Sequence, residues 1–130
     1  MFALDTNALI HALKGMGQLK QKVEQTRPSD LAIPAVVVYE LEFGSLGSRN
    51  PETRKRELNR LLDVLPILPF DGNAARHAAR IRFDLERSGE SIGPLDTLIA
   101  GTVLANGATL VTHNLKEFSK VPGLRVEDWF

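Results

Sequence analysis

Near its N-terminus the chain reads Phe2-Ala3-Leu4-Asp5-Thr6-Asn7, and this segment decides the predicted fold. An apolar run ends at Asp5, and a helical pattern of apolar residues follows directly after Asn7. In an open α/β sheet the carboxyl ends of the parallel strands face the ligand crevice. A buried strand that ends on a carboxylate therefore predicts a polar site at this edge of a sheet.

Short apolar runs alternate with helical patterns along the rest of the chain. Further strands are expected over residues 31–34, 64–70, 108–112 and 124–126, and helices over 8–14, 18–26, 35–44, 52–63, 72–88 and 94–106. Residues 113–118 are expected to form a loop or short turn, and the prolines in 64–70 favour an edge strand there. Strands that alternate with helices predict a three-layer α/β/α fold around a mostly parallel sheet of four to five strands.

Length and composition narrow the possible classes of protein. The 130 residues fit a single domain, and the sixteen basic and sixteen acidic side chains cancel, so overall charge does not indicate a polyanion partner. No cysteine is present, which excludes disulfides, zinc–thiolate sites and thiol catalysis. No apolar run approaches the ~20 residues of a membrane span, and no signal peptide is recognisable. We expect a cytoplasmic protein that does not enter the membrane.

Four acidic residues are candidates for a common site: Asp5, Glu40, Asp96 and Glu117. Each has a structural explanation as well. Asp5 is a good helix N-cap, Asp96 suits the first turn of a helix that begins at Pro94, and Glu117 resembles a solvated loop acid. Glu40 lies in a mainly apolar helix, where an unpaired carboxylate is costly. Because two of the acids follow buried strands and two lie early in helices that enter from the same edge, we expect them to converge.

Converging carboxylates repel one another unless a cation neutralises them. Oxygen ligands without histidine or cysteine suit Mg²⁺ or Mn²⁺, and such a site polarises a phosphodiester and activates water. The four acids Asp5, Glu40, Asp96 and Glu117 together would bind the metal ion. The neutral side chains expected to orient carboxylates or waters are Thr6, Asn7, Thr112 and Asn114. His11, His77 and His113 are scattered along the chain and are interpreted as surface or packing residues.

Four sequence blocks appear in an order that is specific to one family. They are Leu-Asp-Thr-Asn at 4–7, Glu-Leu-Glu-Phe-Gly at 40–44, Asp-Thr-Leu-Ile-Ala at 96–100 and Thr-His-Asn-Leu-Lys-Glu-Phe at 112–118. With these blocks the chain resembles PIN-domain ribonucleases, in particular the VapC toxins of bacterial toxin–antitoxin pairs. The resemblance covers essentially the whole chain. It departs from the family at Glu117, where the family often has Asp, and at Val36-Val37-Val38, where hydroxyl residues usually precede the glutamate.

The resemblance implies a Mg²⁺- or Mn²⁺-dependent endoribonuclease with Asp5, Glu40 and Asp96 as its acidic core. It implies an RNA substrate, with tRNA as one candidate. It further implies a homodimer and a higher hetero-oligomer, in which a cognate antitoxin lays its C-terminal segment across the active-site groove.

Two groups of residues are candidates for contacts with RNA or a protein partner. The basic group comprises Arg49, Arg54, Lys55, Arg56, Arg60, Arg76, Arg80, Arg82 and Arg87, of which Arg82 is the candidate for a phosphate at the crevice. Solvated helix faces paired with nearby acids explain these residues equally well. The apolar group comprises Phe43, Leu46, Leu58, Leu61 and Leu62, for which core packing is the alternative.

Two other functions remain compatible with the sequence. A receiver-like signalling domain has a similar length, a parallel α/β fold and an acidic metal pocket, but it needs a lysine after a late strand, where this chain has His113 and Asn114. A PIN-like binding module without catalysis is the other alternative, against which the three intact acids argue. No Gly-x-Gly-x-x-Gly or Walker sequence follows any strand, so a nucleotide-cofactor enzyme is not expected.

Overall fold

The computed structural model describes residues 1–130 and contains a five-stranded, fully parallel sheet in the order β3-β2-β1-β4-β5. The strands are β1 (Phe2–Leu4), β2 (Leu31–Pro34), β3 (Ile67–Leu68), β4 (Thr109–Val111) and β5 (Arg125–Glu127). The three-layer α/β/α fold is confirmed. The proline-containing segment 64–70 does supply an edge strand, because β3 pairs only with β2.

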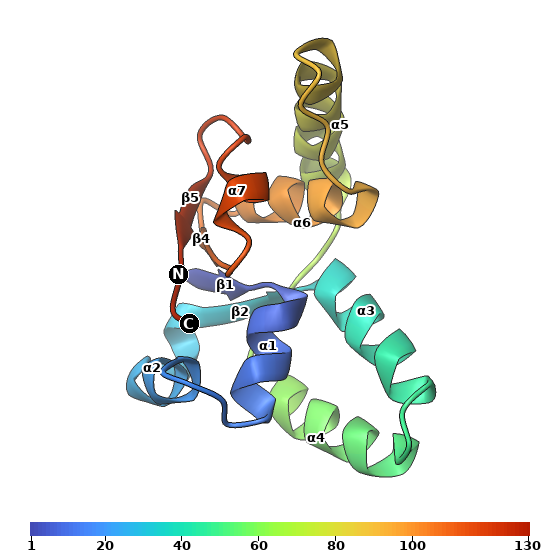
Figure 1. Ribbon diagram of the computed structural model, residues 1–130, viewed down its shortest axis with the longest axis vertical. Coiled ribbons are helices and arrows are strands. Elements are labelled where there is room, and N and C mark those ends of the chain that lie inside the picture. Colours follow the sequence, from blue (N-terminus) through green and yellow to red (C-terminus); the bar gives the residue numbers. More distant parts are fainter.

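Seven α-helices surround the sheet (Figure 1). They are α1 (Thr6–Leu13), α2 (Leu19–Gln25), α3 (Ala35–Leu46), α4 (Pro51–Val64), α5 (Gly72–Arg87), α6 (Pro94–Ala105) and α7 (Leu115–Phe118), with a short 3₁₀ turn η1 (Pro28–Asp30) before β2. Every predicted helix is present within a few residues of its expected bounds. The segment expected to be a loop or turn contains the four-residue helix α7.

The central strands carry the hydrophobic core. Residues of β2 are buried along the whole strand, and those of β1 and β4 are buried except for the first residue of each. Leu4, Ile33 and Leu110 are almost fully buried, and Phe118 of α7 is the largest of the fully buried side chains. Each such side chain stabilises the fold by about 1.5–3 kcal/mol relative to an exposed position.

The register of the sheet places the ends of two strands side by side. Leu4 of β1 lies opposite Val111 of β4, and the Asp5 amide donates a hydrogen bond to the Val111 carbonyl at 3.1 Å. Asp5 and Thr112, the residues that follow β1 and β4, therefore lie side by side at the carboxyl edge of the sheet. On the other side of β1, β2 ends at Pro34 and α3 begins at once, which brings Glu40 to the same edge.

Helices α5 and α6 form the most extensive helix–helix contact in the molecule, and α5 extends away from the sheet beside α6 (Figure 1). The close approach occurs at Gly101 of α6, where a Cβ atom would lie 2.7–2.8 Å from backbone and side-chain atoms of Ala78. Because Asp96 lies in the first turn of α6, this contact helps to fix its position.

No helix in the structure combines the length and the apolar character needed to cross a bilayer.

Candidate active site

The carboxyl edge of the sheet holds a polar cavity of about 120 Å³ that brings three of the four predicted acids together. Its lining residues are Asp5, Thr6, Asn7, Glu40, Asp96, Ile99, Asn114 and Phe118. No lysine or arginine is among them. We call this cavity the acid pocket. Ile99 and Phe118 close its apolar side; both lie within the sequence blocks quoted above, but sequence reasoning did not single them out as site residues.

Asp5 is held at the junction of β1 and α1. It caps α1, because one carboxylate oxygen, Oδ1, accepts a hydrogen bond from the Ala8 amide at 2.8 Å. Burial raises the pKa of the Asp5 carboxyl, and nearby Glu40 raises it further, while hydrogen bonds from the Thr112 side chain and the Ala8 amide and the proximity of His11 act in the opposite direction. Only 7% of Asp5 is exposed. Asp5 therefore caps α1 and lines the pocket at the same time, and its role as a metal ligand stays a prediction.

Asp96 enters the pocket from the first turn of α6. Its pKa is raised above the ordinary value, first by burial and then by the negative charges of Glu40, Asp5 and Glu117. The amino-terminal end of a helix normally favours a carboxylate. Here the neighbouring acids and the loss of solvent outweigh that effect.

Glu40 comes from α3 and is oriented by a residue of α1. The Thr6 hydroxyl donates a hydrogen bond to Glu40 Oε1 at 2.7 Å. The three valines that precede Glu40 in the chain offer it no hydroxyl, so this support comes from another helix.

Replacement of Thr6 by valine is expected to lower the ribonuclease activity that the family resemblance implies by about 10- to 100-fold, because Glu40 would lose the group that orients it. The shape of the side chain is nearly kept, so the melting temperature should change little. Thr6→Ser retains the hydroxyl and should recover most of the activity. Equal rates for the valine and serine variants would show that the hydrogen bond has no role in positioning Glu40.

The fourth predicted acid lies near the acid pocket but does not line it. Glu117 is close enough to Asp96 to raise its pKa, yet its own carboxylate pairs with Lys120 Nζ at 3.4 Å. The predicted neutral residues, in contrast, lie at or beside the acid pocket. Asn7 and Asn114 line the pocket, and the Thr112 hydroxyl accepts a hydrogen bond from the Asn114 amide at 2.9 Å while its side chain also supports Asp5.

The acid pocket fits a partly hydrated divalent cation. Its polar donors are oxygen atoms of carboxylates, amides and a hydroxyl, and no basic side chain lining it compensates the carboxylates. As placed, no three histidine, cysteine or acidic side chains stand close enough to enclose an ion. The assignment of the four acids as metal ligands stays a prediction. Mg²⁺ commonly keeps several waters and uses only one or two carboxylates, so the pocket need not supply three direct acidic ligands.

Some of the other predicted contact residues lie away from the acid pocket. Arg82 pairs with Glu86 at 2.8 Å and lines a separate cavity between α5 and α6. The apolar group divides, because Phe43 and Leu46 are 73% and 76% exposed whereas Leu58 is a core residue with 2% exposure. Leu61 and Leu62 are half-buried against the core. His11 and His113 both pack against the Phe130 ring, with centroid distances of 4.6 Å each, which agrees with a packing role.

Comparisons with known proteins agree with the geometry. Residues 2–124 match the PIN domain family. The chain is 35% identical to the tRNA(fMet)-specific endonuclease VapC of Salmonella typhimurium, over 98% of this chain and 97% of the relative. It is 34% identical to ribonuclease VapC2 of Rickettsia felis, over 99% and 98% of the two chains.

Solved structures show the same relationship. The fold matches a chain in the crystal structure of DNA-bound VapBC from Salmonella typhimurium with a TM-score of 0.93 and 34% identity, covering 99% of this chain and 98% of that one. It matches VapBC2 from Rickettsia felis, bound to a promoter fragment, with a TM-score of 0.92 and 33% identity over the same shares. These matches give no support to a receiver-like domain. The chain belongs to the PIN-domain family and, within it, to the VapC group.

Proposed function

We propose that this protein is a Mg²⁺- or Mn²⁺-dependent endoribonuclease that acts as the toxin of a toxin–antitoxin pair. The observation that carries the proposal is the acid pocket, which is lined by Asp5, Glu40 and Asp96 and by no lysine or arginine side chain. Relatives that align over almost the entire chain are named as ribonucleases or as a tRNA endonuclease, which supports RNA as the substrate.

The bound metal ion and the residues that line the pocket would have separate roles in RNA cleavage. A bound dication would polarise the scissile phosphodiester and lower the pKa of an attacking water. Burial and neighbouring acids raise the pKa values of Asp5 and Asp96, and the charge of the dication would hold both carboxylates in the ionised form. Glu40 would be kept in position by Thr6. The amides of Asn7 and Asn114 would orient water or phosphate oxygens at the rim.

The decisive test is cleavage of RNA by the purified protein, with tRNA as the first substrate. We expect cleavage with Mg²⁺ or Mn²⁺, complete loss in EDTA, and recovery when the metal is added back in excess. Mn²⁺ should also raise the melting temperature of the wild-type protein, because it binds only the folded state. Cleavage that is equal in EDTA would contradict metal dependence. A metal-induced stabilisation without any cleavage would favour a catalytically silent binding module.

A protein partner is part of the proposal. Solved relatives of this chain are VapBC complexes, and the present chain exposes large apolar side chains on α3, with Tyr39 60% exposed beside Phe43 and Leu46. Apolar side chains that gather on one helix commonly mark a protein interface. We propose that the chain forms a homodimer and that its cognate antitoxin joins it in a higher hetero-oligomer. Light scattering of the chain alone and with the antitoxin would measure both assemblies.

A further inference from the structure

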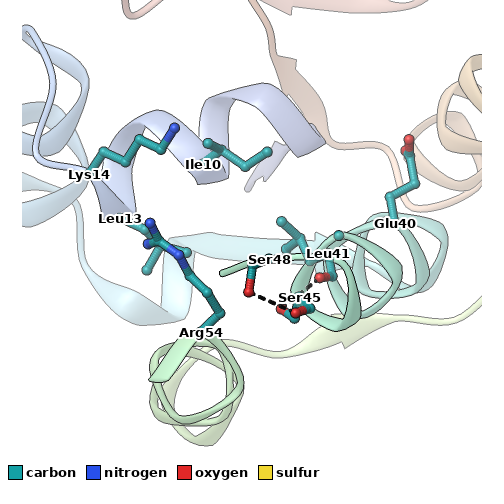
Figure 2. A pocket seen from close by; sticks show the side chains of 9 residues that line it. Ile10, Leu13, Lys14, Glu40, Leu41, Ser45, Ser48 and Arg54 are labelled. Carbon is teal, nitrogen blue, oxygen red and sulfur yellow. Dashed lines mark hydrogen bonds between the residues drawn. The ribbon is translucent and has the colours of Figure 1, made fainter. Parts of the chain in front are cut away.

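A second cavity adjoins the acid pocket and runs between α1, α3 and α4 (Figure 2). It has a volume of about 310 Å³ and is lined by Ile10, Leu13, Lys14, Glu40, Leu41, Gly44, Ser45, Ser48 and Arg54. We call it the α1–α4 groove. Glu40 lines both the groove and the acid pocket, so the two cavities meet at that side chain.

Two cations reach into the groove from opposite walls. Lys14 follows the last residue of α1, and Arg54 lies in the first turns of α4, forty residues later in the chain (Figure 2). Lys14 forms no ion pair or side-chain hydrogen bond. Arg54 pairs with Glu57 at 3.1 Å, but that pair is partly exposed, and exposed ion pairs are weak. Both cations are therefore available to an incoming anion.

The remaining lining residues leave the two cations as the main recognition groups. The Ser45 hydroxyl donates to the Leu41 carbonyl at 2.9 Å, and the Ser48 hydroxyl donates to the Ser45 carbonyl at 2.8 Å. Those hydroxyl donors are thus already used within the protein. Ile10, Leu13 and Leu41 supply apolar surface between the charged groups, and Glu40 is the only carboxylate in the lining.

We propose that the α1–α4 groove is a subsite for the RNA backbone, in which Lys14 and Arg54 bind phosphates that lead away from the scissile phosphate. The inference rests on the proposed ribonuclease function. A strand with one phosphate in the acid pocket must leave it along an adjoining groove, and this groove begins at Glu40. The protein has no net charge, so affinity for a polyanion must come from local cations such as these. Lys14 and Arg54 are then positioning residues for the substrate, not catalytic ones.

The test compares Lys14→Gln, Arg54→Gln and the double variant with two controls that remove the same charge elsewhere. Lys22→Gln lies on α2, and Arg27→Gln lies just before the 3₁₀ turn η1, where Arg27 pairs with Asp30 at 3.0 Å as Arg54 pairs with Glu57 at 3.1 Å. Steady-state cleavage is measured on a long RNA that contains the wild-type cleavage site, in the presence of Mg²⁺. All four positions are at the surface, so circular dichroism melts should coincide.

The double variant should raise KM for the long RNA by about 10-fold or more and leave kcat unchanged, whereas both controls resemble the wild type. The slope of log KM against log salt should fall by about 1.4, since each phosphate contact on a single strand contributes ~0.7. The single variant Lys14→Arg keeps the positive charge and should have the KM of the wild type. A short RNA that ends beside the scissile phosphate cannot reach the groove, so wild type and double variant should cleave it equally.

Three results would overturn the subsite. The first is a double variant that matches the controls on long RNA. The second is an equal loss on short and long RNA. The third is unchanged RNA cleavage combined with loss of inhibition by the antitoxin, which would assign the groove to the protein partner. Failure of the proposed function is distinguishable from all three, because the wild-type protein would then not cleave RNA at all.

Discussion

Asp5→Asn is expected to lower the rate of metal-dependent RNA cleavage by about 10³-fold and, in the same protein, to raise the free energy of unfolding at neutral pH. The loss of rate follows from removing one of the three carboxylates that line the acid pocket, since metal-assisted stabilisation of the transition state amounts to several kcal/mol. The gain in stability follows from the environment of the side chain. Asparagine is also a good N-cap, so the hydrogen bond from the Ala8 amide can be kept.

The sign of the stability change can be worked out from the pKa of Asp5. The pKa of Asp5 is raised in the folded protein above its ordinary value of 3.8. At pH values between the ordinary pKa and the raised pKa, the folded state therefore binds more protons than the unfolded state. Stability of the metal-free wild type therefore falls as the pH rises through this interval, and the penalty persists at neutral pH. The variant has no carboxylate to ionise. Its advantage should be largest at neutral pH and should shrink as the pH falls toward about 4.

Urea denaturation at pH 7.5 and at pH 4.5, without metal, measures the stability change, and cleavage assays with Mg²⁺ measure the rate. Asp71→Asn is the matched control, because Asp71 caps α5 through the Ala74 amide at 2.9 Å and lies outside the acid pocket. It should change neither property appreciably. Asp96→Asn should behave like Asp5→Asn, since the Asp96 pKa is raised in the same direction. A less stable Asp5→Asn at pH 7.5, or one that cleaves at the wild-type rate, would contradict the role assigned to the pocket.

The convergence of Asp5, Glu40 and Asp96 was predictable because it depends on topology. In a parallel sheet every strand ends at the same edge, so Asp5 and Glu40, which follow β1 and β2, come to that edge. A helix that leads back to the start of a strand, as α6 does before β4, begins at the same edge and places Asp96 there. Glu117 was harder to place, because its environment depends on a local partner. Lys120 lies three residues later, just after the short helix α7, and forms an ion pair with the Glu117 carboxylate.

Other features depend on distances that periodicity does not encode. The helix α3 has apolar residues on all faces, so the sequence pattern did not distinguish Val37, which is fully buried, from Phe43, which is 73% exposed. Arg54 was one of several basic residues on its helix, and only the structure shows that it faces Lys14 across a groove. The support of Glu40 by Thr6 likewise joins residues that are 34 positions apart.

Gly101→Ala is expected to lower the free energy of unfolding by about 2 kcal/mol, even though alanine is the better helix former by ~1 kcal/mol. A Cβ at this position would lie 2.7 Å from both the backbone nitrogen and the Cβ of Ala78 and 2.8 Å from its Cα. Helices α5 and α6 would have to move apart, and their contact is the largest between helices in the protein. Thermal and urea denaturation would measure the loss.

Gly44→Ala on α3 is the matched control, because an added Cβ there meets no atom within 4 Å. It should raise the free energy of unfolding by about 0.5–1 kcal/mol, so the two glycine variants should differ in sign. Gly101→Ala that is as stable as Gly44→Ala would show that the helices can separate without cost.

The identity of the clashing atoms also determines how far a second substitution can repair the damage. Ala78→Gly removes only the Cβ, and the backbone nitrogen and Cα of residue 78 remain at 2.7 and 2.8 Å. The double variant should therefore recover part of the lost stability but not all of it. Asp96 lies on α6 five residues before Gly101, so a helix pushed away from α5 also displaces this carboxylate from Asp5 and Glu40. At temperatures well below the melting temperature of Gly101→Ala, this variant should already cleave RNA more slowly than the wild type. A variant that merely unfolds at a lower temperature would keep the wild-type rate at these temperatures.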